Sequence, residues 1–347
     1  MTQFPKAMIA SSIALTIGLS ACGGGGSDIA STPPPPPTPT PTPTPAAGAT
    51  ISALARAVAP NANLFPHAST GGPTIQSHSS TVFPLLESVV SIGPGRVAAG
   101  ATTMNAGATL ASTAPGNGYR LDVGNPALGV SNVALAPSPS GKANVFEADL
   151  GHGATASLDI ANPATSNLSW TTYGFWNVQA SDNYTNAAFV TGYATPATSV
   201  PTSGTAGYRG SVIGEAYHPD AGGIDGVDFY HLSGDATLLV SFGSGSVTGN
   251  LTNMITTGFE GDTAPWNSVS LLGSISGGQF SGTSAATSAP GNSGSLSGSA
   301  TGTFAGMFFG PTAQELGAVW TLHDGTSSAV GSFGAGLDTG CAGCWDY

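Results

Sequence analysis

The residues best suited to chemistry lie in one short segment, which runs from His218 to His231. Three carboxylates, Asp220, Asp225 and Asp228, stand between these two imidazoles. Carboxylates and imidazoles are ligands for hard or borderline cations, so an inter-strand loop that binds a metal is one hypothesis. The spacing matches neither an EF-hand loop nor a zinc module, and Asp and Gly are also the residues of ordinary exposed turns. We therefore assign no metal ligands, and the loop could instead contact a partner.

Cysteine chemistry is confined to the two ends of the chain. Leu19-Ser-Ala-Cys22 has the pattern of the lipobox of bacterial lipoproteins, in which the cysteine thiol is acylated. Near the C-terminus, Cys341-Ala-Gly-Cys344 offers only two thiols, whereas a structural zinc site usually needs four ligands. A redox pair needs a helix N-terminus that lowers a thiol pKa, and a terminal tail provides none. We expect a local disulfide between Cys341 and Cys344 in an oxidising compartment, with pairing between chains left open.

No motif for catalysis is present. No serine has glycine both two residues before and two residues after it, so the Gly-x-Ser-x-Gly nucleophile elbow is missing, and so are the phosphate-binding loop and His-Glu-x-x-His. Glu315 follows the Gly310-Pro311 turn, which favours a structural role at a corner. We predict no catalytic residue, no cofactor and no enzymatic activity.

The composition favours an all-β protein with an acidic surface. The 347 residues include 51 Gly and 26 Pro, and only 7% are charged. Few strong helix formers are present, and Gly, Ser, Thr and Ala suit short strands and tight turns. The formal net charge of −12 argues against nucleic acid as a partner, because its phosphates are bound by Lys and Arg.

The N-terminal fifty residues resemble an export signal followed by a stalk. Residues 1–21 carry one cation, Lys6, and then an apolar run too short to span a membrane, so we interpret them as a signal peptide. Acylation of Cys22 would anchor the chain, and Gly23 after it favours the outer membrane by resemblance to enterobacterial sorting. Residues 22–50 form a lipidated Gly/Pro/Thr-rich tether. Its Pro33–Pro45 run favours an extended polyproline II spacer of about 3.1 Å per residue.

Residues 51–165 are the least regular part of the chain. The stretch 98–117 is almost entirely Ala, Gly, Thr and Ser, with little bulk to fill a core. Strands are predicted near 119–123, 130–135, 144–150 and 154–160. Two interpretations stay open: a smaller irregular β region resembling a handle, or a partly disordered approach segment.

Residues 166–338 predict an antiparallel β-barrel of about eight strands. An aromatic-rich strand opens at Trp170–Trp176. Further strands follow near 187–194, 205–216, 234–242, 245–253, 268–275, 278–284, 298–309, 316–323 and 326–334. Glycines at 243–245 and 277–278 predict tight hairpins. A barrel of this size is filled by its own side chains, so the aromatic residues are expected in its core. Residues 339–347 form a C-terminal tail.

This region also resembles a known family. The motifs are Phe309-Gly-Pro-x-Ala-x-Glu-Leu-Gly317, Gly331-Ser-Phe-Gly334 and, upstream, Thr205-Ala-Gly-Tyr-Arg-Gly-Ser-Val-Ile-Gly214. In this order they are similar to the barrel of the transferrin-binding protein B-like surface lipoproteins. The resemblance covers roughly 168–337. The family usually has Gly-Gly where Gly317-Ala318 stands here.

The resemblance implies a non-enzymatic binding lipoprotein, anchored in the outer membrane and exposed at the cell surface. Its ligand would be a host or environmental macromolecule, such as an iron or haem carrier, and a dedicated outer-membrane translocator or receptor would be a second partner. No ligand-binding residues can be carried over, because specificity in the family lies in rim loops that do not align. The alternative is a structural or adhesive envelope lipoprotein without a small ligand.

Overall fold

The computed structural model describes residues 67–69, 72–74, 82–93, 96–112, 118–142, 144–161, 166–180, 183–224, 226–258 and 261–338. All of them belong to one compact unit, Ala47–Tyr347. The strands are β1 (His67–Ser69), β2 (Gly72–Thr74), β3 (Val82–Gly93), β4 (Arg96–Ser112), β5 (Tyr119–Asp122), β6 (Val133–Pro137), β7 (Val145–Gly151), β8 (Ala154–Ile160), β9 (Thr171–Ala180), β10 (Asn183–Gly192), β11 (Thr205–Ile224), β12 (Val227–Ser241), β13 (Ser246–Thr257), β14 (Thr263–Pro265), β15 (Val269–Ser276), β16 (Gln279–Ala286), β17 (Thr301–Phe309), β18 (Glu315–His323) and β19 (Ser328–Leu337). Two single 3-10 turns, η1 (Pro126–Leu128) and η2 (Ala197–Ser199), interrupt them. In this part of the chain no helix has the length and apolar character needed to cross a membrane.

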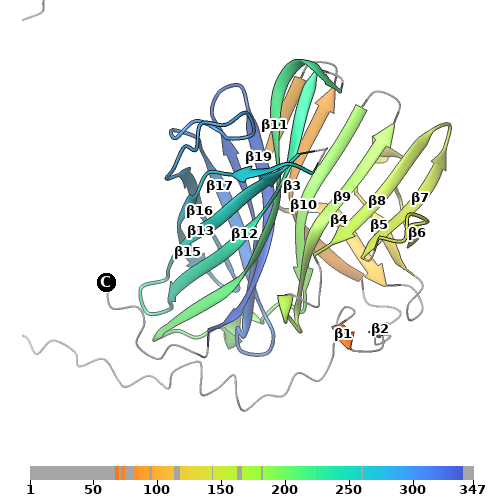
Figure 1. Ribbon diagram of the computed structural model, residues 1–347. Helices are drawn as coiled ribbons and strands as arrows, with labels where there is room; N and C mark the ends of the chain where they lie inside the picture. Colours follow the sequence, from red (N-terminus) through yellow and green to blue (C-terminus); the bar gives the residue numbers. More distant parts are fainter. Residues whose placement is uncertain are drawn as a thin grey trace, which may run out of the picture. The chain divides into compact units, whose positions relative to one another are not determined.

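The strands form two antiparallel barrels, shown side by side in Figure 1. Barrel 1 is closed in the order β10-β3-β4-β5-β6-β7-β8-β9. Barrel 2 runs β12-β11-β19-β18-β17-β16-β15-β13, and a further pairing of β12 with β13 closes this ring of eight strands. The short strand β14 pairs with β13 outside the ring. The predicted all-β architecture with a barrel of about eight strands is confirmed.

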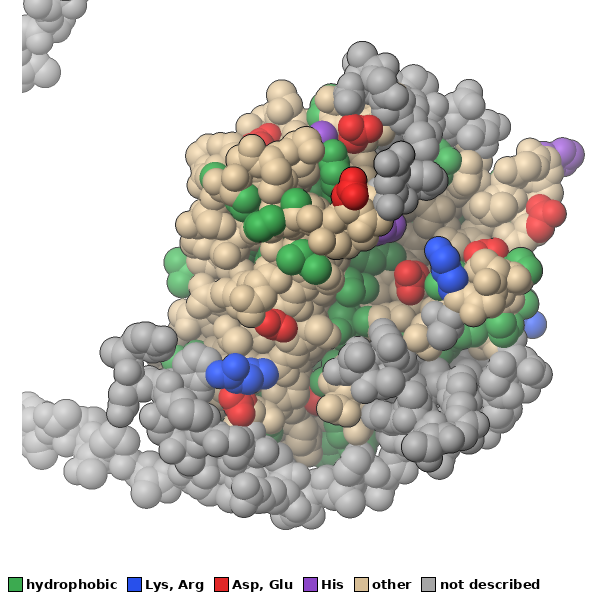
Figure 2. Space-filling view, in the orientation of Figure 1, with side chains coloured by type: hydrophobic (Ala, Val, Ile, Leu, Met, Phe, Trp, Pro, Cys, Tyr) green, Lys and Arg blue, Asp and Glu red, His purple; other side chains and the backbone are tan. Residues whose placement is uncertain are grey.

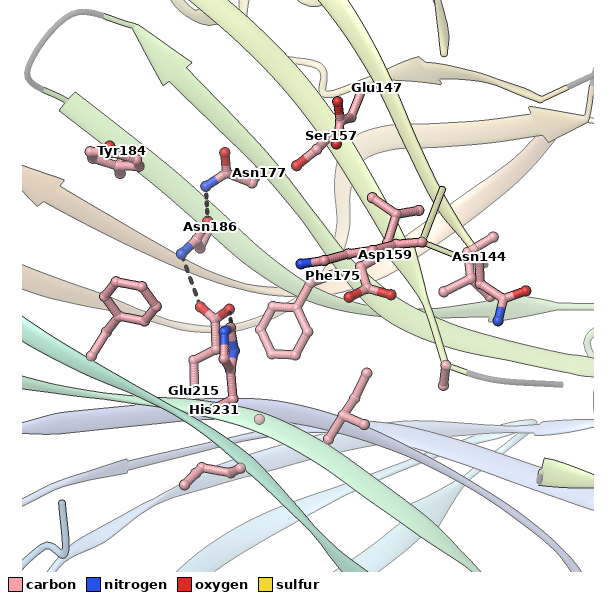
Figure 3. A pocket seen from close by; sticks show the side chains of 18 of the residues that line it. Asn144, Glu147, Ser157, Asp159, Phe175, Asn177, Tyr184, Asn186, Glu215 and His231 are labelled. Atoms are coloured by element: carbon pink, nitrogen blue, oxygen red, sulfur yellow. Dashed lines mark hydrogen bonds and ion pairs between the residues drawn. The ribbon is translucent and has the colours of Figure 1, made fainter. Parts of the chain in front are cut away.

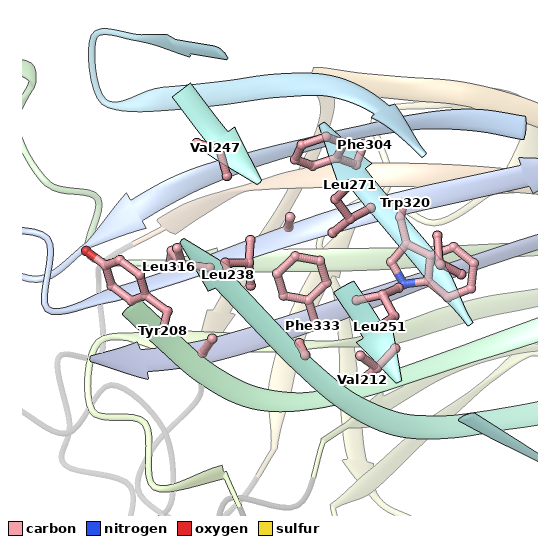
Figure 4. Close-up of a cluster of buried hydrophobic side chains, with 14 of the residues drawn as sticks. Tyr208, Val212, Leu238, Val247, Leu251, Leu271, Phe304, Leu316, Trp320 and Phe333 are labelled. Atoms are coloured by element: carbon pink, nitrogen blue, oxygen red, sulfur yellow. The ribbon is translucent and has the colours of Figure 1, made fainter. Parts of the chain in front are cut away.

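Aromatic side chains fill barrel 2. Trp320, Tyr208 and Phe333 are completely buried in one cluster with Val, Leu and Ala side chains (Figure 4). Rings meet at tilted angles; the centroids of Phe280 and Phe308, for example, are 5.2 Å apart. Both predicted hairpins are present, because Ser241 pairs with Ser246 and Ser276 pairs with Gln279. Burying large rings removes much apolar surface from water and leaves the barrel packed rather than hollow.

Barrel 1 is more regular than the sequence indicates. Residues 98–112 of the stretch 98–117, which was expected to have too little bulk for a core, belong to the long strand β4 between β3 and β5. Bulk comes instead from elsewhere: Tyr119, Phe146, Trp176 and Phe189 are buried in the core of this barrel. Two of these four, Trp176 and Phe189, belong to β9 and β10, which lie beyond the predicted boundary at residue 165. The first predicted region therefore closes into a barrel only with two strands that lie within the predicted second domain.

The change from one barrel to the other falls between Gly192 and Thr205 rather than at 165/166. β9 pairs with β8, and β10 pairs with β3, so both complete barrel 1. The physical reason is that strand pairing joins residues far apart in the chain, such as Val190 with Leu86. The composition along the chain indicates where a strand lies, but it does not indicate with which other strand that strand pairs.

A third apolar cluster joins the two barrels. It contains Leu86, Ala188 and Val190 of barrel 1 together with Val319 and Phe309 of barrel 2. Strand β18 is therefore buried on both faces, one against the barrel 2 core and the other against barrel 1.

Paired glycines make the close approach of the two barrels possible. Gly317 lies opposite Gly334 on neighbouring strands. A Cβ on Gly317 would lie 2.3 Å from Val190 Cγ2, and one on Gly334 would lie 2.5 Å from Leu168 Cδ1. Side chains of β10 and of the segment that leads into β9 therefore occupy the space over these glycines, which have a packing role rather than a conformational one.

Candidate functional site

A cleft of about 1000 Å³ separates the two barrels on one side of their contact. Figure 2 shows this hollow, with hydrophobic side chains gathered inside it and charged side chains beside it. Its walls come from β7 to β10 of barrel 1 and from β11 and β12 of barrel 2. The lining residues are Ser140, Lys142, Asn144, Val145, Glu147, Ser157, Asp159, Ile160, Ala161, Phe175, Asn177, Tyr184, Asn186, Ile213, Gly214, Glu215, Tyr217, Val227, Phe229, His231 and Leu232.

A row of polar side chains crosses the barrel 1 wall of the cleft. Residues directly opposite each other on paired strands share a face of the sheet. Glu147 is paired with Ser157, Ser157 with Asn177, and Asn177 with Asn186, so the four lie in register across β7, β8, β9 and β10. Asn177 Nδ2 donates to Asn186 Oδ1 within this row (Figure 3).

The polar row continues onto barrel 2 through Glu215. Asn186 Nδ2 donates to Glu215 Oε2 at 2.9 Å and to the Tyr217 hydroxyl at 2.8 Å. The Tyr217 hydroxyl in turn donates to the same carboxylate. On the other side, His231 Nδ1 lies 3.6 Å from Glu215 Oε1, and the two residues are register partners on β11 and β12 (Figure 3). One carboxylate thus links both barrels.

A second, less polar row lies beside the first. Asp159 is paired with Phe175 on β8 and β9, and on barrel 2 Tyr217 is paired with Phe229. Each wall of the cleft therefore places a carboxylate next to an aromatic ring: Asp159 with Phe175, and Glu215 with Phe229. Figure 3 shows Asp159 and Phe175 pointing toward the side of the cleft from which Glu215 and His231 project.

Charges in the cleft influence one another across the gap. The Glu215 carboxylate raises the pKa of His231 above its ordinary value, and Asp159 adds to this effect. Surrounding protein raises the pKa of Asp159; His231 and Lys142 oppose this rise while Glu215 adds to it. Complete burial, followed by the neighbouring Glu215 charge, raises the pKa of the Tyr217 hydroxyl well above its usual range. The phenol is therefore neutral at physiological pH and serves as a hydrogen-bond donor.

The segment 218–231, for which metal binding was one hypothesis, does not bring its two imidazoles together. It is a long hairpin rather than a loop, since β11 extends to Ile224 and β12 begins at Val227. Pro219 is tolerated in β11 because the pairing of β11 with β19 ends at Tyr217, so the missing N–H costs no hydrogen bond to β19. His218 Nε2 lies 3.1 Å from the Gly294 carbonyl oxygen, whereas His231 faces Glu215.

The two imidazoles consequently lie on opposite faces of the hairpin and do not converge. Across the described part of the chain, no three His, Cys, Asp or Glu side chains are close enough to share a metal ion. Asp228 is paired with His218 across the hairpin. Asp225 and the side chain of Asp220 lie outside the described residues, as do Cys22, Cys341 and Cys344.

Glu315 serves the junction between the barrels. Its Oε1 accepts a hydrogen bond from the Ser169 amide at 2.6 Å, and Oε2 accepts one from the Trp170 amide at 2.9 Å. Burial raises the pKa of this carboxyl, and these backbone hydrogen bonds act in the opposite direction. The carboxylate thus fixes the segment leading into β9 against the start of β18, which agrees with the structural corner role expected from the sequence.

Of the residues that line the cleft, only His231 is also a candidate ligand proposed from the sequence. Glu147, Ser157, Asn177 and Asn186 are scattered along 40 residues of sequence and meet only through strand register. The available signal was weak: polar side chains at mid-strand positions, such as Asn177 between Trp176 and Val178, which are both buried. Such a residue indicates a strand whose outer face is not covered by apolar packing.

A comparison with known proteins found a match for barrel 2. Residues 200–336 match the family model described as the C-lobe and N-lobe beta barrels of Tf-binding protein B. No curated protein matches the chain significantly. Among solved structures, a variant of transferrin-binding protein B from Haemophilus parasuis is 17% identical, with 73% of this chain and 45% of that chain covered and a TM-score of 0.47.

Two further solved structures are similar. The isotype 1 transferrin-binding protein B from serogroup B Neisseria meningitidis is 21% identical, with 73% of this chain and 43% of that chain covered and a TM-score of 0.41. The N-lobe domain of lactoferrin-binding protein B from Moraxella bovis is 14% identical, with 54% and 81% covered and a TM-score of 0.33. The chain spans less than half the length of both transferrin-binding proteins. The match to the family model covers residues 200–336, which lie in barrel 2.

Proposed function

We propose that this protein is a non-enzymatic binding lipoprotein, anchored in the outer membrane and exposed at the cell surface. It captures a macromolecule there, and an iron or haem carrier is the first class of ligand to test. The observation that carries this proposal is the match of residues 200–336 to the barrels of transferrin-binding protein B. The name of that family states the ligand of its members, and fold alone does not transfer a ligand.

The N-terminal sequence supports the anchored part of the proposal. The lipobox ending at Cys22 supplies an acylation site, and the Pro/Thr-rich run that follows supplies a spacer. A surface-exposed lipoprotein needs a route across the outer membrane, so a dedicated translocator is the second proposed partner. Capture itself requires no catalytic group.

Protease shaving of intact cells tests the location first. Loss of the barrel, detected with an antibody against residues 200–336, while a periplasmic control protein stays intact supports surface exposure. Full protection of the barrel would contradict it and favour a structural or adhesive role inside the envelope.

Capture is tested next with the acylated full chain in detergent micelles. Immobilised transferrin, lactoferrin and haemoglobin serve as probes, and serum albumin serves as the control protein. Saturable binding to one of the three carriers supports the proposal. Equal retention on albumin, or no retention on any carrier, would contradict iron-carrier capture.

A further inference from the structure

The cleft between the barrels has the dimensions and lining of a ligand site. Its volume of about 1000 Å³ is at the upper end of the range for small-molecule pockets. Apolar and polar side chains both reach it, which allows an apolar stem and a polar head to be held together. The walls are held by paired strands and by the Asn186–Glu215 hydrogen bond, so the site is preformed rather than assembled from loops.

The charges of the cleft favour a cation. Among the described residues that line the cleft, three carboxylates come from three strands, Glu147 on β7, Asp159 on β8 and Glu215 on β11, and Lys142 is the one permanent cation. Glu147 accepts a hydrogen bond from Ser138, and Glu215 is engaged by donors from both barrels. Asp159 differs, because its side chain is exposed to the cleft and, among the described residues, no hydrogen bond reaches its carboxylate.

Aromatic rings complete the set of groups that an organic cation needs. Phe175 stands next to Asp159 in register, and Phe229 stands beside the His231–Glu215 pair. The faces of aromatic rings attract a cation that has lost part of its water shell. A carboxylate beside a ring holds both the charged head and the carbon stem of an alkylamine or alkylguanidine.

We propose that this cleft binds an organic cation, an amine or guanidinium group on an apolar stem, with Asp159 as its principal carboxylate and Phe175 and Phe229 against its stem. A metal ion does not suit the site, since within the described residues no three ligating side chains converge. An anion would face three carboxylates. The cationic group can come from a free small amine or from a basic side chain of a protein. The proposal does not depend on whether the protein captures an iron carrier.

Isothermal titration calorimetry with the full chain in detergent micelles tests the site. Phenethylamine is the probe, and 2-phenylethanol, which has the same ring and length without the charge, is its matched control. Saturable binding of the amine and at least about tenfold weaker binding of the alcohol are expected, because the charge-assisted hydrogen bond is lost. Equal binding of both, or binding of neither, would overturn the proposal.

Variants locate the binding to Asp159. Asp159→Asn is expected to weaken phenethylamine binding by about tenfold or more, whereas Asp235→Asn, which removes an exposed carboxylate of β12 that does not line the cleft, leaves it unchanged. Should Asp159→Asn fold poorly in circular dichroism, Phe175→Leu keeps all charges and is expected to weaken binding by several-fold. Unchanged affinity in a folded cleft variant would refute the site.

A blocked tripeptide, acetyl-Gly-Lys-Gly-amide, separates the two sources. Binding of this peptide with the same sensitivity to Asp159→Asn assigns the cleft to a basic side chain of a protein partner. Binding of phenethylamine alone assigns it to a free amine. Peptide binding that ignores Asp159→Asn would contradict the assignment of the cleft as the cation site.

Discussion

The carboxyl group of Glu87 should make barrel 1 less stable as the pH rises. Glu87 is 1% exposed and lies inside this barrel, where the Trp176 indole N–H donates a hydrogen bond to it. Burial raises its pKa from 4.5 to about 7, with the Trp176 hydrogen bond acting in the opposite direction. Folding therefore favours the protonated acid, and ionisation of the folded protein carries a cost.

The sign and size follow from this difference in pKa. The folded state holds its proton to higher pH than the unfolded state, so the free energy of unfolding falls as pH rises from about 4.5 to about 7. Below this window both states are protonated, and above it both are ionised. A difference of roughly 2.5 pKa units, at about 1.4 kcal/mol per unit, corresponds to about 3 kcal/mol.

Replacement of Glu87 by Gln isolates the effect. The amide stays neutral at every pH and its oxygen still accepts the hydrogen bond from Trp176. Its NH₂ group adds a buried donor, which shifts stability by a similar amount at all pH values. The informative quantity is therefore the difference between pH 8 and pH 4.5: relative to the native chain, Glu87→Gln should gain about 3 kcal/mol over that interval.

Denaturant unfolding followed by tryptophan fluorescence measures this quantity at the two pH values. Asp149→Asn is the control, because Asp149 is an exposed carboxylate of the same barrel whose Oδ1 accepts a hydrogen bond from the nearby Gly151 amide. If the difference in unfolding free energy between Glu87→Gln and the native chain changes by less than about 0.5 kcal/mol from pH 4.5 to pH 8, the reasoning is refuted, since that is the scale expected of unremarkable surface changes.

Three other perturbations test the junction and the anchor. Gly317→Ala should lower the free energy of unfolding by about 1–3 kcal/mol, because its Cβ would lie 2.3 Å from Val190 Cγ2. The control is Gly243→Ala, where the nearest atom is 4.0 Å away; it should leave the free energy of unfolding nearly unchanged in the same denaturant titration. Glu315→Ala should cost about 2–4 kcal/mol in that assay by removing the acceptor of two backbone amides, and a loss under about 0.5 kcal/mol would contradict its junction role. Cys22→Ala should abolish acylation, seen by labelled palmitate and by membrane partitioning; unchanged partitioning would contradict the anchor.

Local patterns predicted the strands of barrel 2 well. Two of its hairpins have glycine at the turn, at residues 243–245 and 277–278, and this pattern can be recognised in the sequence. Its strands pair mostly with the next strand in the sequence, so the order of the strands along the chain predicts their order in the sheet. The aromatic residues expected in the core are there, Phe304 and Trp320 among them, because a small barrel has no other place for large rings.

Barrel 1 could not be predicted in the same way, because its closure depends on pairing across the chain. β10 pairs with β3, which lies roughly a hundred residues earlier in the sequence. The composition of either strand does not indicate that the other is its partner. The Ala/Gly/Thr/Ser-rich strand β4 carries little bulk of its own, so its place in a barrel depends on rings supplied by β5, β7, β9 and β10. A segment that looks too poor for a core can thus be one wall of a core that other segments fill.

The same dependence on register decides which chemistry the molecule can perform. His218 and His231 are neighbours in a sequence motif, yet strand alternation sends them to opposite faces, and only His231 reaches the cleft. Asn186 and Glu215 share no motif, yet their hydrogen bond joins the two barrels at the wall of the cleft. The glycine pair that brings the barrels together and the polar row that stays open beside it are parts of one packing arrangement. Barrel 2 contacts barrel 1 more closely along β18 and β19 than along β11 and β12. The space that is left between β11 and β12 and the outer wall of barrel 1 is the cleft in which we place the ligand.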